Sequence, residues 1–262
     1  MKVTKKSKKE IAILRQGGKI LAEALVVASN FASLANEKKV TTKDLDRIAE
    51  EVVRGHGAEP AFLNYQPEGY ENPFPAALCT SVNDEIVHGF PNENVVLKNG
   101  DVVSLDLGVK FKGLFTDSAV TVAIGKVDEQ TQRLIDVTKK GLENGIKQLV
   151  PGNTLGDYGK EVDGYAHENG FVTVWGLVGH GVGYSQHEDP QIPNYGKAGK
   201  GLVIEEGMVL ALEPMFTLKS RDIVMDSNGY TFSTSDGEMA AHFEHTVAIT
   251  KKGNQVLTRA EE

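Results

Sequence analysis

The spacing of apolar residues along the chain predicts two pairs of helices, each followed by strands. Apolar side chains recur at helical spacing from residue 11 to about 31, and a second helix is expected from 41 to 57. Thr41 or Thr42 is its expected N-cap, with Asp44 in the first turn. Two more helices are expected at about 128–149 and 154–169. The predicted strands are 76–82, 102–109, 114–124, 171–178, 207–213, about 229–234 and 241–250, with a loop at 60–75.

The order of helices and strands occurs twice, and a short motif repeats with it. The motif recurs at a constant offset of 113 residues, with Thr41, Asp44 and Gly57 in the first copy and Thr154, Asp157 and Gly170 in the second. We interpret this as a structural duplication, which gives two α/β halves related by a pseudo-twofold axis. The predicted class is α+β, in one domain spanning residues 1–262 with a site between the halves.

Composition places the chain among ordinary globular proteins. It has 262 residues, with 40% hydrophobic and 24% charged residues, enough to bury a sizeable core. No apolar run is long enough to span a membrane, and the basic N-terminus leads into an amphipathic segment rather than a secretory signal. Cys79 is the only cysteine, which excludes an internal disulfide. A cytoplasmic location is therefore expected.

The net charge of −8 argues against a general nucleic-acid binder, and no DNA partner is expected. The notable basic cluster is the segment 1–10, with lysines at positions 2, 5, 6, 8 and 9. The simpler interpretation is a solvated helix start. The alternative is a weak, transient contact with an anionic partner such as ribosomal RNA.

The candidate chemistry is carried by four acids and one histidine: Asp106, Asp117, His180, Glu213 and Glu244. Such an oxygen-rich set suits two adjacent divalent ions. If the turn after 102–109 centres on Phe111 and Lys112, Asp106 and Asp117 become direct cross-strand neighbours, which repel each other unless a cation lies between them. The alternative for Asp117 is an ordinary turn or solvent-facing aspartate.

The other three candidates also have simpler explanations. His180 lies between two glycines, which leave room for a ligand, but a lone histidine in such a context is more often a hydrogen-bonded core or loop residue. Glu213 and Glu244 lie in strand patterns, where a carboxylate needs a partner, and a salt bridge to Lys or Arg would serve as well as a metal. His187 lies in a polar loop where it could stabilise an oxyanion. His56, His167, His242 and His245 are expected to be structural or surface residues.

Taken together, the motifs resemble a known family over nearly the whole chain. The segments SVNDEIVHGFP, GDVVSLDLGV, LFTDSAVT, GHGVGYSQHEDPQIPNYG, LALEPMF and FEHTVAIT closely resemble methionine aminopeptidases of the bacterial type (type I). The resemblance implies the pita-bread fold, with curved antiparallel sheets inside and helices outside. It also implies removal of the initiator methionine from nascent proteins, preferably before a small second residue, by a water activated at a dinuclear metal centre.

The resemblance also implies roles for individual residues. Asp117 and Glu244 would bridge two divalent ions, Asp106 would complete one site, and His180 with Glu213 the other. Glu213 would also shuttle a proton, His187 would bind the scissile carbonyl, and His88 the substrate amide. The metals admitted by such a set are Mn²⁺, Fe²⁺, Co²⁺ or Zn²⁺. A monovalent cation (Na⁺ or K⁺) near Asn83 and Glu85, and a monomeric state, are further expectations.

The expected methionine pocket is formed by Phe62, Tyr65, Cys79 and Tyr230. Two features depart from the family pattern. The loop 66–75 is longer than expected, and Gln186 stands where an aromatic pocket residue is expected.

Two other functions compete with this interpretation. Xaa-Pro peptidases share the five-ligand pattern, but they usually carry an additional N-terminal domain for which this chain has no room. The second is a non-enzymatic pita-bread protein that binds RNA or protein after losing its metals, yet here all five ligands and both accessory histidines are present.

Overall fold

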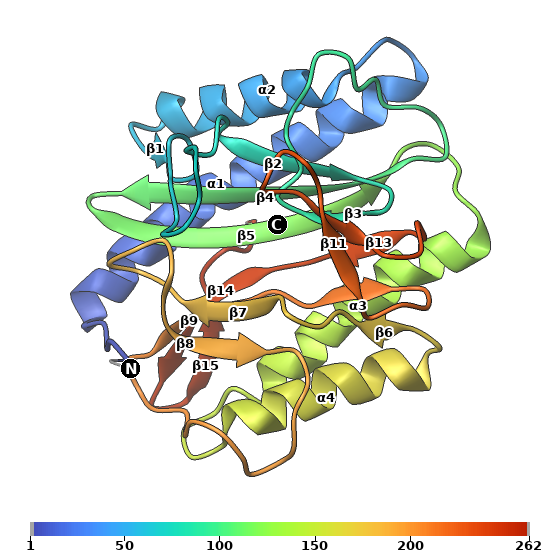
Figure 1. Ribbon diagram of the computed structural model, residues 1–262. Coiled ribbons are helices and arrows are strands. Elements are labelled where there is room, and N and C mark those ends of the chain that lie inside the picture. Colours follow the sequence, from blue (N-terminus) through green and yellow to red (C-terminus); the bar gives the residue numbers. More distant parts are fainter. Residues whose placement is uncertain (1–2, 261–262) are drawn as a thin grey trace.

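The computed structural model describes residues 3–260, in which helices cover one side of a set of antiparallel strands (Figure 1). The helices are α1 (Lys8–Ser33), a short 3₁₀ helix (Leu34–Asn36), α2 (Thr42–Gly55), α3 (Glu129–Lys147) and α4 (Leu155–Glu168). All four predicted α-helices are present. Among the described residues, no helix is both long and apolar enough to cross a membrane.

Helix α1 begins earlier than the apolar pattern suggested, because a capping box fixes its first turn. The Ser7 hydroxyl accepts a hydrogen bond from the Glu10 backbone N–H at 3.3 Å, and the Glu10 carboxylate accepts one from the Ser7 N–H at 2.7 Å. These bonds satisfy two backbone donors that would otherwise be unpaired at the helix start. Polar residues 8–10 therefore join the helix before its apolar face begins.

The two halves repeat the same helix start and stop, which confirms the predicted duplication. The Thr41 N–H donates to the Asp44 carboxylate at 2.9 Å, and the Thr154 N–H donates to that of Asp157 at 2.7 Å. Helices α2 and α4 each contain 14 residues. Soon after each helix a glycine with positive φ turns the chain: Gly57 (φ 70°) and Gly170 (φ 83°).

A long hairpin forms the centre of the first half. Its strands are β4 (Val102–Phe111) and β5 (Leu114–Ala123), and β1 (Glu59–Pro60) and β2 (Leu78–Val82) also pair with β4. The predicted turn at Phe111–Lys112 is wrong by one residue, because Phe111 pairs with Leu114. The turn residues are Lys112 (φ 50°) and Gly113 (φ 82°), and positive φ at both positions is typical of two-residue hairpins.

The second half contains a five-stranded sheet, in the order β15-β14-β9-β7-β8. Its strands are β7 (Val178–Gly181), β8 (Glu188–Pro193), β9 (Val209–Leu212), β14 (His245–Thr250) and β15 (Gly253–Val256). Two three-stranded sheets accompany it, one of β6 (Val172–Thr173), β10 (Met215–Thr217) and β13 (Ala240–His242), the other of β3 (Glu85–Val87), β11 (Ile223–Met225) and β12 (Phe232–Thr234).

Two predicted strands are each broken in two. The run 171–178 divides into β6 and β7, with Gly176 at positive φ (86°) between them. The run 241–250 divides at residues 243–244, where the chain leaves the sheet of β10 and enters that of β9. Alternation of polar and apolar residues continues through such a break, so the pattern alone did not reveal it.

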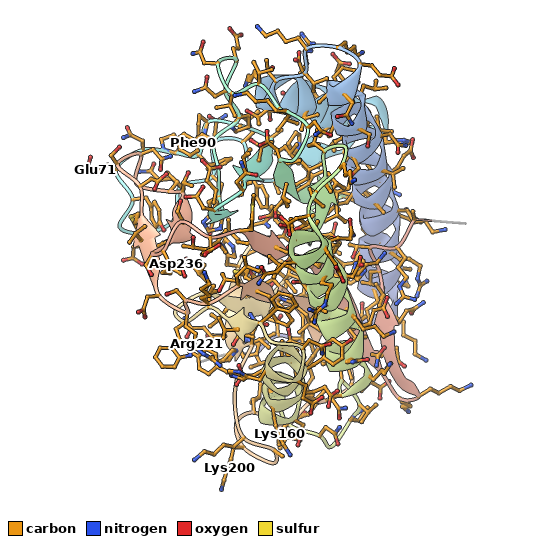
Figure 2. All side chains as sticks on the ribbon, turned by 90° about the vertical axis from the view of Figure 1, so that its right-hand side faces the viewer. Glu71, Phe90, Lys160, Lys200, Arg221 and Asp236 are labelled. Carbon is orange, nitrogen blue, oxygen red and sulfur yellow. The ribbon has the colours of Figure 1, made fainter. Side chains whose placement is uncertain are left out.

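The halves meet along β5. The Glu244 N–H donates to the Ala119 carbonyl at 2.9 Å, and the Ala119 N–H donates back at 3.3 Å. Separate apolar clusters lie beneath the helices of each half. Leu21, Leu45 and Leu105 belong to the first, and Leu134, Tyr158 and Leu210 to the second. Helix α1 and the long loop 66–75 lie on opposite sides of the molecule, as Figure 2 shows from the position of Glu71.

The basic N-terminal segment is not simply a solvated helix start. The Lys6 side chain is almost fully buried and pairs with Glu188, while Lys5 pairs with Glu205 on the surface. Lys8 and Lys9 are exposed. Lys2 lies outside the described residues.

Candidate metal centre and substrate pocket

The five candidate ligands converge from distant parts of the chain onto one cavity. Their elements are β4 for Asp106, β5 for Asp117, β7 for His180, the turn after β9 for Glu213 and the break before β14 for Glu244. Together with His187 they form three overlapping groups, and within each group the potential ligand atoms all lie within 4.8 Å of one another. The groups are Asp117, His180 and His187; His180, Glu213 and Glu244; and Asp106, Asp117 and Glu244. The same side chains line a cavity between the halves.

The two aspartates are neighbours, although not in the predicted register. Asp106 pairs with Ala119, and Asp117 pairs with Gly108. They are therefore diagonal rather than direct cross-strand neighbours. Because the shift is two residues, both side chains still lie on the same face of the hairpin.

Both glutamates occupy positions where a strand changes sheet. Glu213 separates β9 from β10, and Glu244 separates β13 from β14. Among residues 3–260, neither has an ion pair with Lys or Arg, so the simpler salt-bridge explanation is wrong. Glu213 instead lies 3.5 Å from His180 Nε2.

The cluster consists of buried acids that form no ion pair with a lysine or arginine of the described residues. Asp106, Asp117 and Glu244 are between 2% and 7% exposed. One carboxylate oxygen of each has no hydrogen-bond partner among the described residues. Burial raises the pKa of Asp106 to about 7. Burial, followed by neighbouring carboxylates, also raises the pKa of Asp117, Glu213 and Glu244 well above the usual range.

This arrangement fits divalent cations. Isolated buried carboxylates are costly, and such groups in proteins are paired or coordinate metals. Four carboxylates and one imidazole, with no thiolate, form a hard donor set for first-row divalent ions. The unpartnered oxygens of Asp106, Asp117 and Glu244 are free acceptors for such ions.

His180 is held in the form that binds metals. Its Nδ1 lies 2.8 Å from the Gly181 carbonyl, so Nδ1 carries the proton and Nε2 faces the acids with a free lone pair. Burial lowers its pKa to about 3, so the ring is neutral near pH 7. Nε2 lies 3.5 Å from Glu213 and 3.9 Å from Asp117.

The accessory histidines flank the acids. The His187 ring lies 4.4 Å from that of His180, and its Nδ1 lies 2.8 Å from the Tyr65 hydroxyl. His88 follows β3 with φ 60°, and burial lowers its pKa to about 4. Both line the cavity with the five candidate ligands.

All four residues predicted for the methionine pocket line the same cavity: Phe62, Tyr65, Cys79 and Tyr230. The sequence interpretation missed two further aromatic residues, Tyr70 and Phe74, which come from the long loop 66–75. The rings of Tyr70 and Tyr230 are 4.6 Å apart, and the Tyr230 hydroxyl donates to the Asn72 carbonyl at 2.6 Å. The loop therefore closes one side of the pocket, which its aromatic content could have suggested.

Gln186 points toward the cluster of acids. It is 2% exposed, and its side-chain N–H donates to the carboxylate of Asp117. Asn83, in the turn between β2 and β3, and Glu85, the first residue of β3, are not among the residues that line this cavity. The Asn83 amide oxygen accepts from the Val102 N–H at 2.9 Å, and Glu85 accepts from the Val82 N–H at 2.8 Å. The monovalent cation expected beside them stays a prediction.

Of the histidines assigned to structural or surface positions, His242 is the most unusual. It is 1% exposed, and neither ring nitrogen has a partner among residues 3–260. Burial lowers its pKa to about 3. His56 and His167 lie at the surface beside Glu23 and Asp163.

The chain is similar to proteins of known family over almost its full length. The family described as metallopeptidase family M24 matches residues 12–251. The methionine aminopeptidase of Aquifex aeolicus is 44% identical over 255 residues, which cover 96% of this chain and 97% of the relative. Methionine aminopeptidase 1 of Bacillus subtilis is 40% identical, covering 97% and 98%.

Solved structures agree with these likenesses. The methionine aminopeptidase of Thermotoga maritima superposes with a TM-score of 0.91 at 39% identity, covering 98% of this chain and 100% of the other. A prolidase of Pyrococcus horikoshii has a TM-score of 0.74 at 21% identity, and the likeness covers 98% of this chain but 64% of the prolidase. The latter shows a shared fold only. The expected pita-bread fold is confirmed.

Proposed function

The chain belongs to metallopeptidase family M24, among its methionine aminopeptidases, and we propose that it removes the initiator methionine from newly made proteins with a small second residue. The observation that carries this proposal is the cluster of buried, uncompensated carboxylates beside an aromatic pocket in one cavity. The cluster supplies hydrolytic chemistry, and the pocket selects the side chain at the N-terminus.

The cluster would hold two divalent ions. Its oxygen and nitrogen donors suit Mn²⁺, Fe²⁺, Co²⁺ or Zn²⁺. Asp117 and Glu244 would be shared, Asp106 would complete one site, and His180 with Glu213 the other. Bound ions supply a nucleophilic water at neutral pH and polarise the substrate carbonyl.

Three side chains of the cavity would bind substrate or move protons. The Tyr65 hydroxyl lies 2.8 Å from His187 Nδ1. If the hydroxyl donates, the proton of His187 resides on Nε2, from which it can be donated to the carbonyl oxygen. His88 would bind the substrate amide. Glu213 would accept a proton from the water and pass it to the leaving amine.

The pocket suits an unbranched apolar side chain. Its walls are aromatic rings together with the small, buried Cys79. The Cys79 pKa is raised well above its usual value, chiefly by burial, so the residue remains a neutral thiol. A thioether gains favourable contacts with aromatic rings, which favours methionine over charged residues at the N-terminus.

The test is release of methionine from short peptides after chelator treatment and restoration of single metals. We expect release from Met-Ala-Ser only after a metal is restored, and little from Met-Leu-Ser, which differs in the size of the second residue. Ala-Pro-Ser tests the Xaa-Pro alternative, for which cleavage of this peptide and not of Met-Ala-Ser would be the signature. A folded protein that binds metal but cleaves none of these peptides would contradict the proposal.

A further inference from the structure

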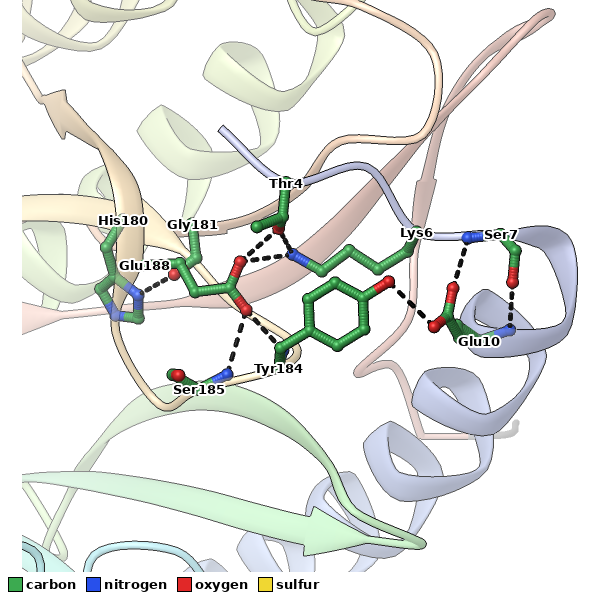
Figure 3. Close-up of polar contacts among 9 residues, drawn as sticks. All are labelled: Thr4, Lys6, Ser7, Glu10, His180, Gly181, Tyr184, Ser185 and Glu188. Atoms are coloured by element: carbon green, nitrogen blue, oxygen red, sulfur yellow. Dashed lines mark hydrogen bonds and ion pairs between the residues drawn. The ribbon is translucent and has the colours of Figure 1, made fainter. Parts of the chain in front are cut away.

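The N-terminal segment is packed against the half of the molecule that lies farthest from it in sequence. The Lys6 backbone N–H donates to the Gly207 carbonyl at 2.7 Å, just before β9, and Val3 packs on the apolar cluster of the second half. Figure 3 shows this segment running beside the turn 183–188, which leads from β7 into β8 and includes Glu188, the first residue of β8. The first residues therefore connect the start of α1 to a segment that borders the cavity.

The Lys6 ammonium group is buried in an ion pair. Its Nζ lies 2.8 Å from Glu188 Oε2, and the two side chains are only 1% and 7% exposed. Thr4 completes the group, because its hydroxyl donates to the same Glu188 oxygen and accepts from Lys6 (Figure 3). A Cβ on Gly183 would lie 2.3 Å from Lys6 Cε, so the glycine leaves the space that the lysine occupies. Removing one partner of such a pair leaves an uncompensated buried charge.

Glu188 connects this ion pair to the backbone of the turn. Its other oxygen accepts hydrogen bonds from the N–H groups of Tyr184 and Ser185, the latter at 3.0 Å (Figure 3). Glu188 also pairs with Gly181, whose carbonyl accepts the hydrogen bond that orients His180. The carboxylate therefore closes the turn that carries His187.

A second contact fixes the outer side of the same turn. The Tyr184 hydroxyl donates to Glu10 at 2.9 Å, and Glu10 is the residue whose carboxylate completes the capping box of α1. The Lys6 ammonium group also lies 5.1 Å from the centre of the Tyr184 ring. The turn is thus held from inside by Lys6 and from outside by the first turn of α1.

We propose that Lys6 is a positioning residue for the reaction, which acts through Glu188 to hold the turn 183–188 and thereby place the His187 imidazole in the active site. This inference rests on the proposed function, since His187 is assigned there to the scissile carbonyl. Lys6 itself does not reach the cavity, and its effect on turnover is indirect.

The decisive comparison is Lys6→Met with Lys5→Met. Both changes remove one charge from neighbouring lysines, and each lysine has a glutamate partner, but the Lys5 pair is about half exposed. We expect Lys6→Met to lower kcat by about 10- to 100-fold, because small displacements of a reacting group have effects of this size. KM should change little, since the pocket residues lie on other elements. Lys5→Met should match the wild type.

Coupling to Glu188 separates positioning from a general loss of stability. If Lys6 acts through Glu188, Glu188→Gln should reproduce the kcat loss, and the double variant should lose no more than either single one. Additive losses would mean independent, merely structural effects. Glu188→Gln also keeps the proposal testable if Lys6→Met does not fold.

Hydrogen exchange of the amides in residues 183–188 gives a readout that needs no activity. We expect faster exchange there in Lys6→Met than in Lys5→Met, with metal content unchanged. Equal exchange and equal kcat in the two variants would overturn the proposal. A wild-type protein that cleaves no peptide would refute the proposed function. If Lys6→Met still exchanged faster than Lys5→Met at residues 183–188, the ordering of the turn by Lys6 would stand as a separate result.

Discussion

At the scale of single residues, the site is defined by polar groups that the fold leaves without protein partners. Asp106, Asp117 and Glu244 each keep one oxygen free of hydrogen bonds among the described residues. Sequence patterns identified these acids because carboxylates in strand-like runs are unusual. They could not show that none of the lysines and arginines in residues 3–260 forms an ion pair with these acids, since that depends on residues distant in the chain.

Changes at the ligands should remove both activity and metal. We expect Asp106→Asn, His180→Ala and Glu244→Gln to lower peptide hydrolysis by more than about 100-fold. Each change removes either a negative charge or a coordinating nitrogen from the proposed metal centre. Metal bound per protein after dialysis should fall in parallel, as measured by elemental analysis. Normal hydrolysis by Glu244→Gln would contradict the dinuclear assignment.

Changes at the accessory histidines should separate turnover from metal binding. His88→Ala and His187→Ala are expected to reduce kcat by roughly 100-fold, the usual contribution of a positioned proton donor. Metal content should remain that of the wild type, because neither residue belongs to the proposed ligand set. Loss of metal from His88→Ala would show that its role is wrongly assigned.

At the scale of elements, helices were more predictable than strands. Helical periodicity and the Thr41 and Thr154 caps are local signals, and all four α-helices were found. The breaks within two predicted strands were not found, because the strand pattern continues through Gly176 and through Glu244, where the chain changes sheet. The strand end at Glu213 was predicted to within one residue. The hairpin register failed for a different reason: the turn is chosen by which residues adopt positive φ, and the favoured pair is Lys112 and Gly113.

This turn gives a test of the register. Gly113 has φ 82° with open space around its Cα, so an alanine there would be strained without clashing. We expect Gly113→Ala to lower the free energy of unfolding by about 1–2 kcal/mol, the cost of a left-handed conformation. Gly55→Ala is the matched control, since it also lies in open space but without positive φ, and it should not destabilise. Equal effects in denaturant titrations would contradict the turn assignment.

At the scale of the whole molecule, the site joins the two halves. Asp106 and Asp117 come from the first half, and His180, Glu213 and Glu244 from the second. The Lys6–Glu188 pair also crosses between them, over 182 positions of sequence. A basic N-terminal run predicts solvation on average, and only the folded chain shows that one of its lysines is buried.

Because the halves bring acids together, metal-free protein should lose stability as pH rises above about 7.5. The unfolded chain releases carboxyl protons near pH 4. The folded chain keeps them to about pH 7 at Asp106 and well above the usual range at Asp117, Glu213 and Glu244. Over that interval the folded state binds more protons, so the free energy of unfolding falls with rising pH.

Buried histidines act in the opposite direction, but only at lower pH. The pKa values of His180 and His242 are lowered to about 3, and those of His88, His187 and His245 to about 4, whereas the unfolded value is about 6.5. Their gain in stability is therefore nearly complete about one pH unit above that value, near pH 7.5. Denaturant titrations between about pH 7.5 and 8.5 therefore isolate the acids, with a slope of about 1.4 kcal/mol per pH unit for each retained proton. Saturating Mn²⁺ should abolish this slope, because bound metal replaces the protons. Stability of the metal-free protein that rises over this range would mean that the acids are already ionised and compensated by protein groups.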